Sequence, residues 1–120
     1  MIYIYDKKNN LYLHLEGTIK ENLEKRGFNE IISTRGICFH EQTRGVVNIT
    51  IEISFLSEDD YKKLKLIFLN STSDLYVEDD DTGTTYSKYF IKGNTLALEK
   101  NEDIDTKEYY YKGSLPLNKR

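Results

Sequence analysis

Cys38 and His40 are the residues whose types and spacing come closest to reactive chemistry in this sequence. Positions i and i+2 share one face of a strand, so a contact between thiolate and imidazole is possible there. A zinc site would need further ligands, and no second CxxC or HxxxH motif supplies them. Nothing near Cys38 marks an oxyanion hole. We therefore expect Cys38 to be a small buried apolar residue and the protein not to be an enzyme.

The segment 79–83, Asp-Asp-Asp-Thr-Gly, superficially resembles a calcium-binding loop, because carboxylates precede a glycine. An EF-hand loop also needs a bidentate Glu at its end and a helix on each side. Strand-like sequence flanks this segment, which favours a hairpin turn. We expect no metal and no cofactor.

Composition limits the classes of function further. The chain has 120 residues, a net charge of −3 and a single cysteine. This indicates one domain, residues 1–120, with no internal disulfide and no basic excess for binding a phosphate backbone. No apolar run has the length of a membrane span. We expect an intracellular protein that binds neither membrane nor specific nucleic acid sequences, with ten tyrosines suited to half-buried strands or binding surfaces.

The stretch 46–70 predicts a strand followed by a helix. Apolar residues alternate with polar ones from Val47 to Phe55, which is the pattern of a strand with one buried face. Ser57 then precedes three acidic residues and helical spacing of apolar residues, so it is the expected N-cap of a helix at about 57–70. We expect Leu64 and Phe68 to pack against the sheet.

The remaining sequence predicts mostly strands. Residues 1–5 and 10–16 form a predicted hairpin, with His14 on its outer face. Residues 18–30 fit a short helix opened by a capping box at Thr18, but also an irregular loop or a strand. A meander of strands is predicted at 74–78, 85–92, 95–99 and 107–112, followed by a tail. The expected fold class is α+β, mainly antiparallel, as a sandwich or partly open barrel with one amphipathic helix.

An antiparallel meander would bring two acidic turns to the same end of the sheet. Charged turns commonly serve only to keep loops solvated and to discourage edge pairing. Alternatively, they form a docking surface for a basic partner, because complementary charge speeds encounter and fixes register. The candidate partner-binding residues are Glu78, Asp79, Asp80, Asp81, Glu102, Asp103 and Asp105.

Roughly the last two-thirds of the chain resembles small tail-associated proteins of long-tailed bacteriophages. The similar residues are Ile49-x-Ile51-x-Ile53-x-Phe55-Leu56-Ser57-Glu58-Asp59-Asp60-Tyr61-x-x-Leu64, Leu75-Tyr76-Val77-Glu78-Asp79 and Tyr89-x-x-Lys92-Gly93-Asn94. The resemblance implies a β-sandwich or barrel with one packed helix, similar to tail-tube and distal-tail proteins. Such proteins assemble into rings by joining sheets and exchanging loops, so the implied partners are other tail proteins and further copies of the chain.

A composition rich in Lys, Asn, Ile and Tyr suggests an AT-rich bacterial genome and hence a prophage. Small acidic prophage proteins also include anti-CRISPR inhibitors, which bind an RNA-guided Cas nuclease at its positively charged channel. The acidic turns would suit such a partner. The residues do not distinguish this inhibitor from a tail component.

Overall fold

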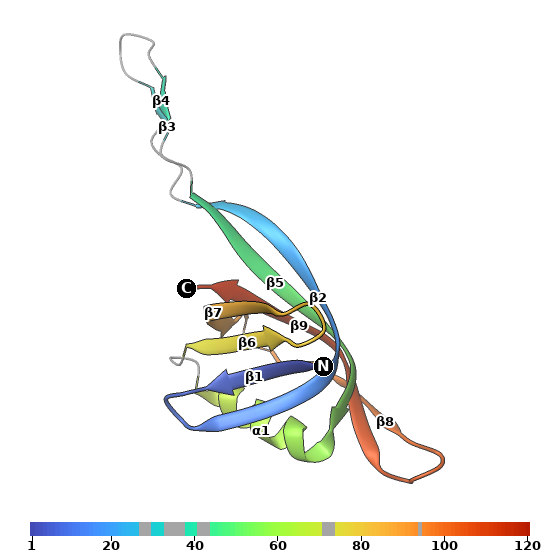
Figure 1. The fold of residues 1–120 in the computed structure, drawn as a ribbon. Coiled ribbons are helices and arrows are strands. Elements are labelled where there is room, and N and C mark those ends of the chain that lie inside the picture. Colours follow the sequence, from blue (N-terminus) through green and yellow to red (C-terminus); the bar gives the residue numbers. More distant parts are fainter. Residues whose placement is uncertain (27–29, 33–37, 41–43, 71–73, 94) are drawn as a thin grey trace.

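A computed structural model describes residues 1–26, 30–32, 38–40, 44–70, 74–93 and 95–120 (Figure 1). The expected α+β class, mainly antiparallel with one helix, is confirmed. The elements, in chain order, are β1 (Ile2–Asp6), β2 (Leu11–Arg26), β3 (Glu30–Ile32), β4 (Cys38–His40), β5 (Arg44–Ser57), α1 (Glu58–Leu69), β6 (Leu75–Asp79), β7 (Thr84–Ile91), β8 (Glu99–Glu102) and β9 (Tyr109–Lys119).

The main sheet closes on itself to form a barrel. Its strand order is β5-β2-β1-β6-β7-β9-β8, and β5 also pairs with β9. All pairings are antiparallel. Six strands therefore form a ring, and β8 pairs with β9 as an additional strand.

Strand β2 changes partner near its middle. Its first residues pair with β1, and from Glu16 onward it pairs with β5. The register shifts between Glu16 and Gly17, because Ser54 of β5 is an extra residue there; its hydroxyl donates to the Glu16 carbonyl at 3.1 Å. Such a bulge bends a strand and increases its twist. Beyond this bulge, β2 pairs with β5 and no longer with β1.

The core lies inside the barrel and beneath the helix. Alternate residues of the strands point inward, among them Leu11, Leu13 and Leu15 of β2, on the face opposite His14. Phe55 was expected to continue the buried face of β5, but it is 45% exposed and Leu56 is buried instead. The bulge at Ser54 reverses the alternation at this point. The buried apolar residues are Ile2, Ile4, Leu13, Leu15, Ile49, Ile51, Ile53, Leu56, Leu64, Ile67, Leu75, Val77, Tyr89, Tyr111, Leu115 and Leu117.

Helix α1 packs against β2, β5 and β9. Ser57 is its N-cap, as predicted, and its hydroxyl accepts a hydrogen bond from the amide of Asp60 at 3.3 Å. Leu64 is buried, but Phe68 is only half-buried and Ile67 takes the other core position. Tyr61 stacks on Tyr111 of β9, with ring centroids 3.7 Å apart. The helix has neither the length nor the apolar character needed to cross a membrane, and the described residues include no other helix.

Three sequence expectations are corrected. Residues 18–26 are the second half of β2, so the helix and loop alternatives are wrong there, while 27–29 lie outside the described residues. The strand predicted at 95–99 is wrong at 95–98, and β8 runs from Glu99 to Glu102, into the stretch after 99 that we expected to be a polar loop. Residues 113–119 are not a tail, because β9 continues to Lys119 and pairs with both β5 and β7.

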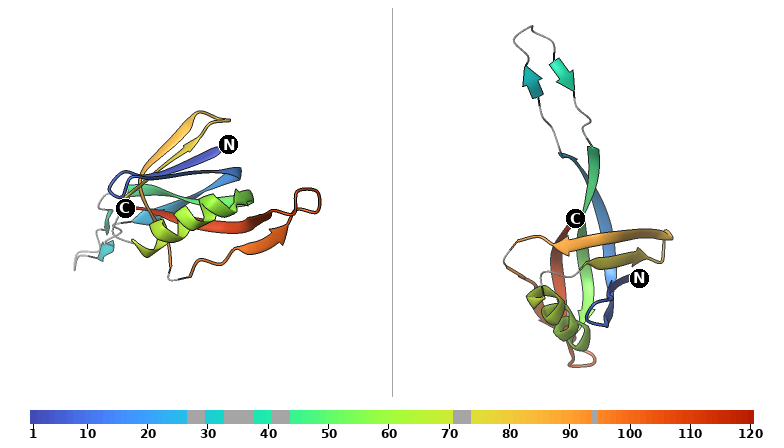
Figure 2. Two further views of the ribbon diagram at one scale, coloured as in Figure 1. Left: turned by 90° about the horizontal axis from the view of Figure 1, so that it is seen from below. Right: turned by 90° about the vertical axis from the view of Figure 1, so that its left-hand side faces the viewer.

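The ends of β2 and β5 project from the barrel as an arm. We use this name for residues 22–26 and 44–46 together with β3 and β4, which pair with each other (Figures 1 and 2). The radius of gyration is 18.0 Å, whereas a compact domain of this length has about 14 Å. The principal extents of 70 × 28 × 26 Å show the same elongation.

Candidate functional site

The seven acidic candidates lie at the tips of two different hairpins. Glu78, Asp79, Asp80 and Asp81 belong to the β6–β7 hairpin, and Glu102, Asp103 and Asp105 to the β8–β9 hairpin. Figure 1 and both views of Figure 2 show these tips apart. The meander from which one acidic surface was predicted is wrong, because 95–98 is not a strand and β7 pairs with β9 rather than β8. The acidic residues therefore form two groups on separate hairpin tips.

Several of these carboxylates hold their own turns. The Asp79 carboxylate accepts from the amide of Asp81 at 3.1 Å, and the Asp81 carboxylate accepts from the amino group of Met1 at 3.0 Å. This hydrogen bond, with the nearby acidic side chains, raises the pKa of that amino group. In the other hairpin, Asp103 accepts from the amide of Asp105 at 3.0 Å. Within the described part of the chain, no ion pair engages Glu78 or Asp80.

A tyrosine-rich surface lies beside the β6–β7 group, and the sequence analysis did not find it. It is the outer face of β2, β1 and β6, which we call the tyrosine face. In the pairing register, Tyr12, Tyr5 and Tyr76 are direct neighbours across the three strands. The next row consists of His14, Tyr3 and Glu78.

Three rings of the tyrosine face, those of Tyr3, Tyr5 and Tyr12, contact one another. Tyr3 stacks on Tyr12 with centroids 5.7 Å apart, and Tyr5 meets Tyr12 edge-on at 6.4 Å. Tyr12 is 47% exposed and Tyr76 is 39% exposed. Partial burial, together with Tyr3 and Glu78 nearby, raises the pKa of Tyr12. The Tyr12 hydroxyl therefore keeps its proton at neutral pH and can donate or accept a hydrogen bond there.

Part of the tyrosine face can be predicted from the sequence. Tyr3 and Tyr5 alternate with Ile2 and Ile4 in the predicted hairpin, which is enough to place them outward with Tyr12. Tyr76 joins the row only because β6 pairs with β1. That pairing is distant in sequence, so no local pattern predicts it.

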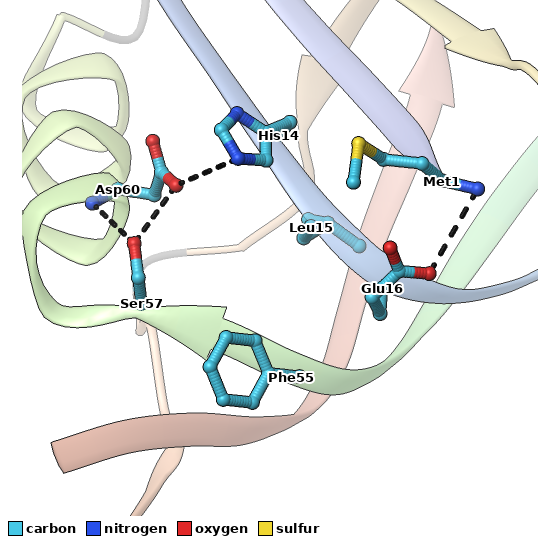
Figure 3. Close-up of a pocket in the computed structure, with 7 residues that line it drawn as sticks. All are labelled: Met1, His14, Leu15, Glu16, Phe55, Ser57 and Asp60. Carbon is cyan, nitrogen blue, oxygen red and sulfur yellow. Dashed lines mark hydrogen bonds and ion pairs between the residues drawn. The ribbon is translucent and has the colours of Figure 1, made fainter. Parts of the chain in front are cut away.

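A small cavity of about 140 Å³ separates the tyrosine face from the start of α1 (Figure 3). His14, Ser57 and Asp60 line it, together with Met1, Leu15, Glu16 and Phe55. Asp60 is 5% exposed, and it accepts a hydrogen bond from the Ser57 hydroxyl at 2.8 Å. His14 Nε2 and Lys63 Nζ each lie 3.8 Å from an Asp60 oxygen.

This arrangement of serine, aspartate and histidine does not have the geometry of a catalytic triad. A triad places the imidazole between the serine and the carboxylate, so that the imidazole takes the serine proton. Here Asp60 lies between Ser57 and His14, and the serine proton points to the carboxylate (Figure 3). The group instead caps α1 and satisfies a buried carboxylate.

The remaining sequence candidates do not add a chemical site. The side chains of Cys38 and His40 lie outside the described residues, so the thiolate–imidazole contact stays a prediction. The 79–83 segment is a hairpin turn, as expected, with Gly83 at φ +73°. Among the described residues, no group of three His, Cys, Asp or Glu side chains is placed to hold a metal ion.

Comparison with known proteins adds no assignment. No protein-family model matches the chain, and no curated protein matches it significantly.

Proposed function

We propose that this protein is a non-enzymatic bacteriophage or prophage protein that acts by binding other proteins. In this proposal it is a tail-associated structural component, made in the cytoplasm of the bacterial host and then carried in the virion. The observation that supports the proposal is the arm. Rings of tail proteins form by joining sheets and exchanging loops, and the arm is a long two-stranded extension suited to such an exchange.

The arm needs a neighbour for physical reasons. An isolated two-stranded ribbon is marginally stable in water, because it has no core to bury. Asn22, Leu23 and Glu24 are all exposed, and Leu23 is 77% exposed although it is apolar. Burial of such a ribbon against another copy would stabilise both partners. The arm is therefore the proposed interface between copies or with a neighbouring tail protein.

Light scattering after size-exclusion chromatography, over a wide range of concentration, tests this proposal. The matched variant replaces residues 25–45 by Asn-Gly, because Glu24 and Val46 are direct neighbours that a two-residue turn can join. We expect the wild-type mass to rise with concentration and the shortened protein to stay monomeric with an unchanged melting temperature. A wild-type monomer at every concentration, even after cross-linking, would contradict assembly through the arm.

One observation favours a second candidate, an anti-CRISPR inhibitor that binds a Cas nuclease. Glu78 and Asp80 take part in no ion pair within the described residues, so their charge is available to a basic channel. The test is cleavage of target DNA by host RNA-guided nucleases in the presence of the purified protein. Inhibition that weakens as salt rises would favour this candidate over the tail component.

A further inference from the structure

We propose that the tyrosine face and the carboxylates beside it form a docking site for an arginine-bearing segment of a protein partner. This inference rests on the proposed function of protein binding, and it adds the surface and the chemistry of the partner. The face is separate from the arm, so the two interfaces can be tested independently (Figure 1).

The first support is the aromatic row itself. Tyr12, Tyr5 and Tyr76 are direct neighbours on three adjacent strands, and such strands lie about 4.8 Å apart, so the three side chains form a row across the sheet. Tyr5 meets Tyr12 edge-on, and Tyr12 and Tyr76 keep 47% and 39% of their surface exposed. A guanidinium group stacks on such rings and is attracted by their negative faces.

The second support is the charge around the row. Glu78 lies one row away, paired with Tyr3, and Asp80 follows at the turn, where its amide donates to the Met1 carbonyl at 3.0 Å. Neither carboxylate has an ion-pair partner among the described residues. A cation seated on the tyrosines would therefore also gain an acceptor for charge-assisted hydrogen bonds.

The lysines near the tyrosine face lie at its edges. Lys7 and Lys8 lie in the turn between β1 and β2, at the opposite end of the strands from Glu78, and both are exposed. Lys63 lies beside Asp60 at the start of α1. The Met1 amino group lies at the same end as Glu78, but it is paired with the Asp81 carboxylate at 3.0 Å. The lysines are at the margins, so the carboxylates Glu78 and Asp80 define the local field. This field disfavours nucleic acid, whose phosphates would be repelled.

The test is a titration of the full-length protein, ¹³C-labelled at its tyrosine rings, with two capped hexapeptides. One alternates serine with arginine, and the other replaces each arginine by citrulline, which has the same shape without the charge. We expect the arginine peptide to shift the ring signals of Tyr5, Tyr12 and Tyr76, and to bind at least about tenfold more tightly than the citrulline peptide. The difference should shrink as salt rises.

Two variants assign the site. Tyr12→Thr keeps a residue suited to strands and should weaken binding of the arginine peptide about tenfold. Tyr109→Thr removes a comparably exposed tyrosine on β9, which contacts Lys100, and should leave the affinity unchanged. Glu78→Gln tests the charge without altering the aromatic row. It should reduce both the affinity for the arginine peptide and the salt dependence of that affinity.

Three outcomes would overturn the proposal. They are equal binding of the two peptides, shifts confined to tyrosines outside the face, and no binding at millimolar peptide. Binding of oligothymidylate or of an oligosaccharide to these tyrosines, without binding of the arginine peptide, would assign the face to that ligand instead. Self-association of the same samples is measured in parallel, so failure of assembly through the arm can be distinguished from failure of peptide binding.

Discussion

Gly17 is the residue on which the change of partner in β2 depends. A Cβ atom at this position would lie 2.2 Å from the carbonyl oxygen of Glu52, which is part of the backbone of β5. Backbone atoms cannot move aside as a side chain can. The close pairing of β2 and β5 at the bulge therefore requires glycine.

We predict that Gly17→Ala lowers the free energy of unfolding by about 1–3 kcal/mol through this overlap. Urea denaturation followed by circular dichroism measures the change. Gly45→Ala is the matched control on the paired strand, because its Cβ would meet only the Leu23 side chain, at 3.3 Å. Equal stability of the two variants would contradict the steric explanation.

Ser57 makes two hydrogen bonds at the start of α1. Its hydroxyl accepts from the Asp60 amide and donates to the Asp60 carboxylate. We predict that Ser57→Ala costs about 1 kcal/mol of stability through loss of the cap. Thermal unfolding monitored at 222 nm provides the measurement, with exposed Ser87→Ala as the control. No loss of stability in Ser57→Ala would mean that water replaces the cap without cost.

At the scale of elements, α1 is attached to the barrel by one side. We predict that Leu64→Ala lowers the free energy of unfolding by about 2–5 kcal/mol, because it leaves a cavity in the core. Leu66→Ala removes the same atoms from a half-exposed position of the same helix and should cost far less. Denaturant titrations of both variants test which face of α1 packs on the barrel. A larger loss of stability in Leu66→Ala than in Leu64→Ala would contradict packing through Leu64.

Two tyrosine hydroxyls of β7 tie the barrel to the strands that form the arm. Tyr86 donates to the Glu21 carboxylate at 2.5 Å, and Tyr89 donates to the Val47 carbonyl at 2.5 Å. Burial and the bond to Glu21 raise the pKa of Tyr86 above its ordinary value of 10.0. The folded state therefore holds this proton to higher pH than the unfolded state does.

This difference predicts a pH dependence of stability. Because the unfolded state releases the Tyr86 proton first, the free energy of unfolding should fall as pH rises above about 10. Tyr86→Phe should reduce the slope of that fall, whereas at pH 8 it should cost only the hydrogen bond, about 1 kcal/mol. Urea denaturation of both proteins from pH 8 to 11 tests the prediction. Identical slopes would show that Tyr86 does not bind its proton more tightly in the folded state.

The sequence predicted the elements whose signals are local. The helix followed from Ser57 and the apolar spacing after it, and the β1–β2 hairpin followed from alternation. The sequence does not decide the secondary structure of the second half of β2. Asn22, Leu23 and Glu24 are exposed on both faces of the arm, so apolar and polar residues do not alternate there. Leu96 and Leu98 alternate like a strand, but they pack against the core without strand pairing.

Residues 113–119 were missed for a different reason. Pro116 cannot donate a backbone hydrogen bond and is unusual inside a sheet, yet it pairs with Thr50 and accepts from the Lys92 amide at 3.0 Å. The closure of the barrel by β9 is a contact between distant segments that no local pattern encodes. Because the sequence did not reveal this pairing of β9, we predicted a simple meander and placed the two acidic groups on one surface.

At the scale of the whole molecule, the two acidic groups lie on separate hairpin tips, so their roles can be tested separately. If a basic partner docks beside the tyrosine face, Asp79→Asn, Asp80→Asn and Asp81→Asn combined should weaken its binding and reduce the salt dependence. Glu102→Gln, Asp103→Asn and Asp105→Asn combined carry the same charge change at the other hairpin and should have little effect. Affinities measured by isothermal titration at two salt concentrations separate these cases, and equal effects would restore a single acidic surface.

The closure of the barrel by β9 also sets an order on folding during translation. The ring has no closing contact until β9, which ends at Lys119, has left the ribosome and reached both β5 and β7. Until then β5 and β7 present open edges, and open edges pair readily with other nascent chains. Synthesis that pauses before residue 109 should therefore hold the protein in its most aggregation-prone form, and holdase chaperones should engage it in that interval.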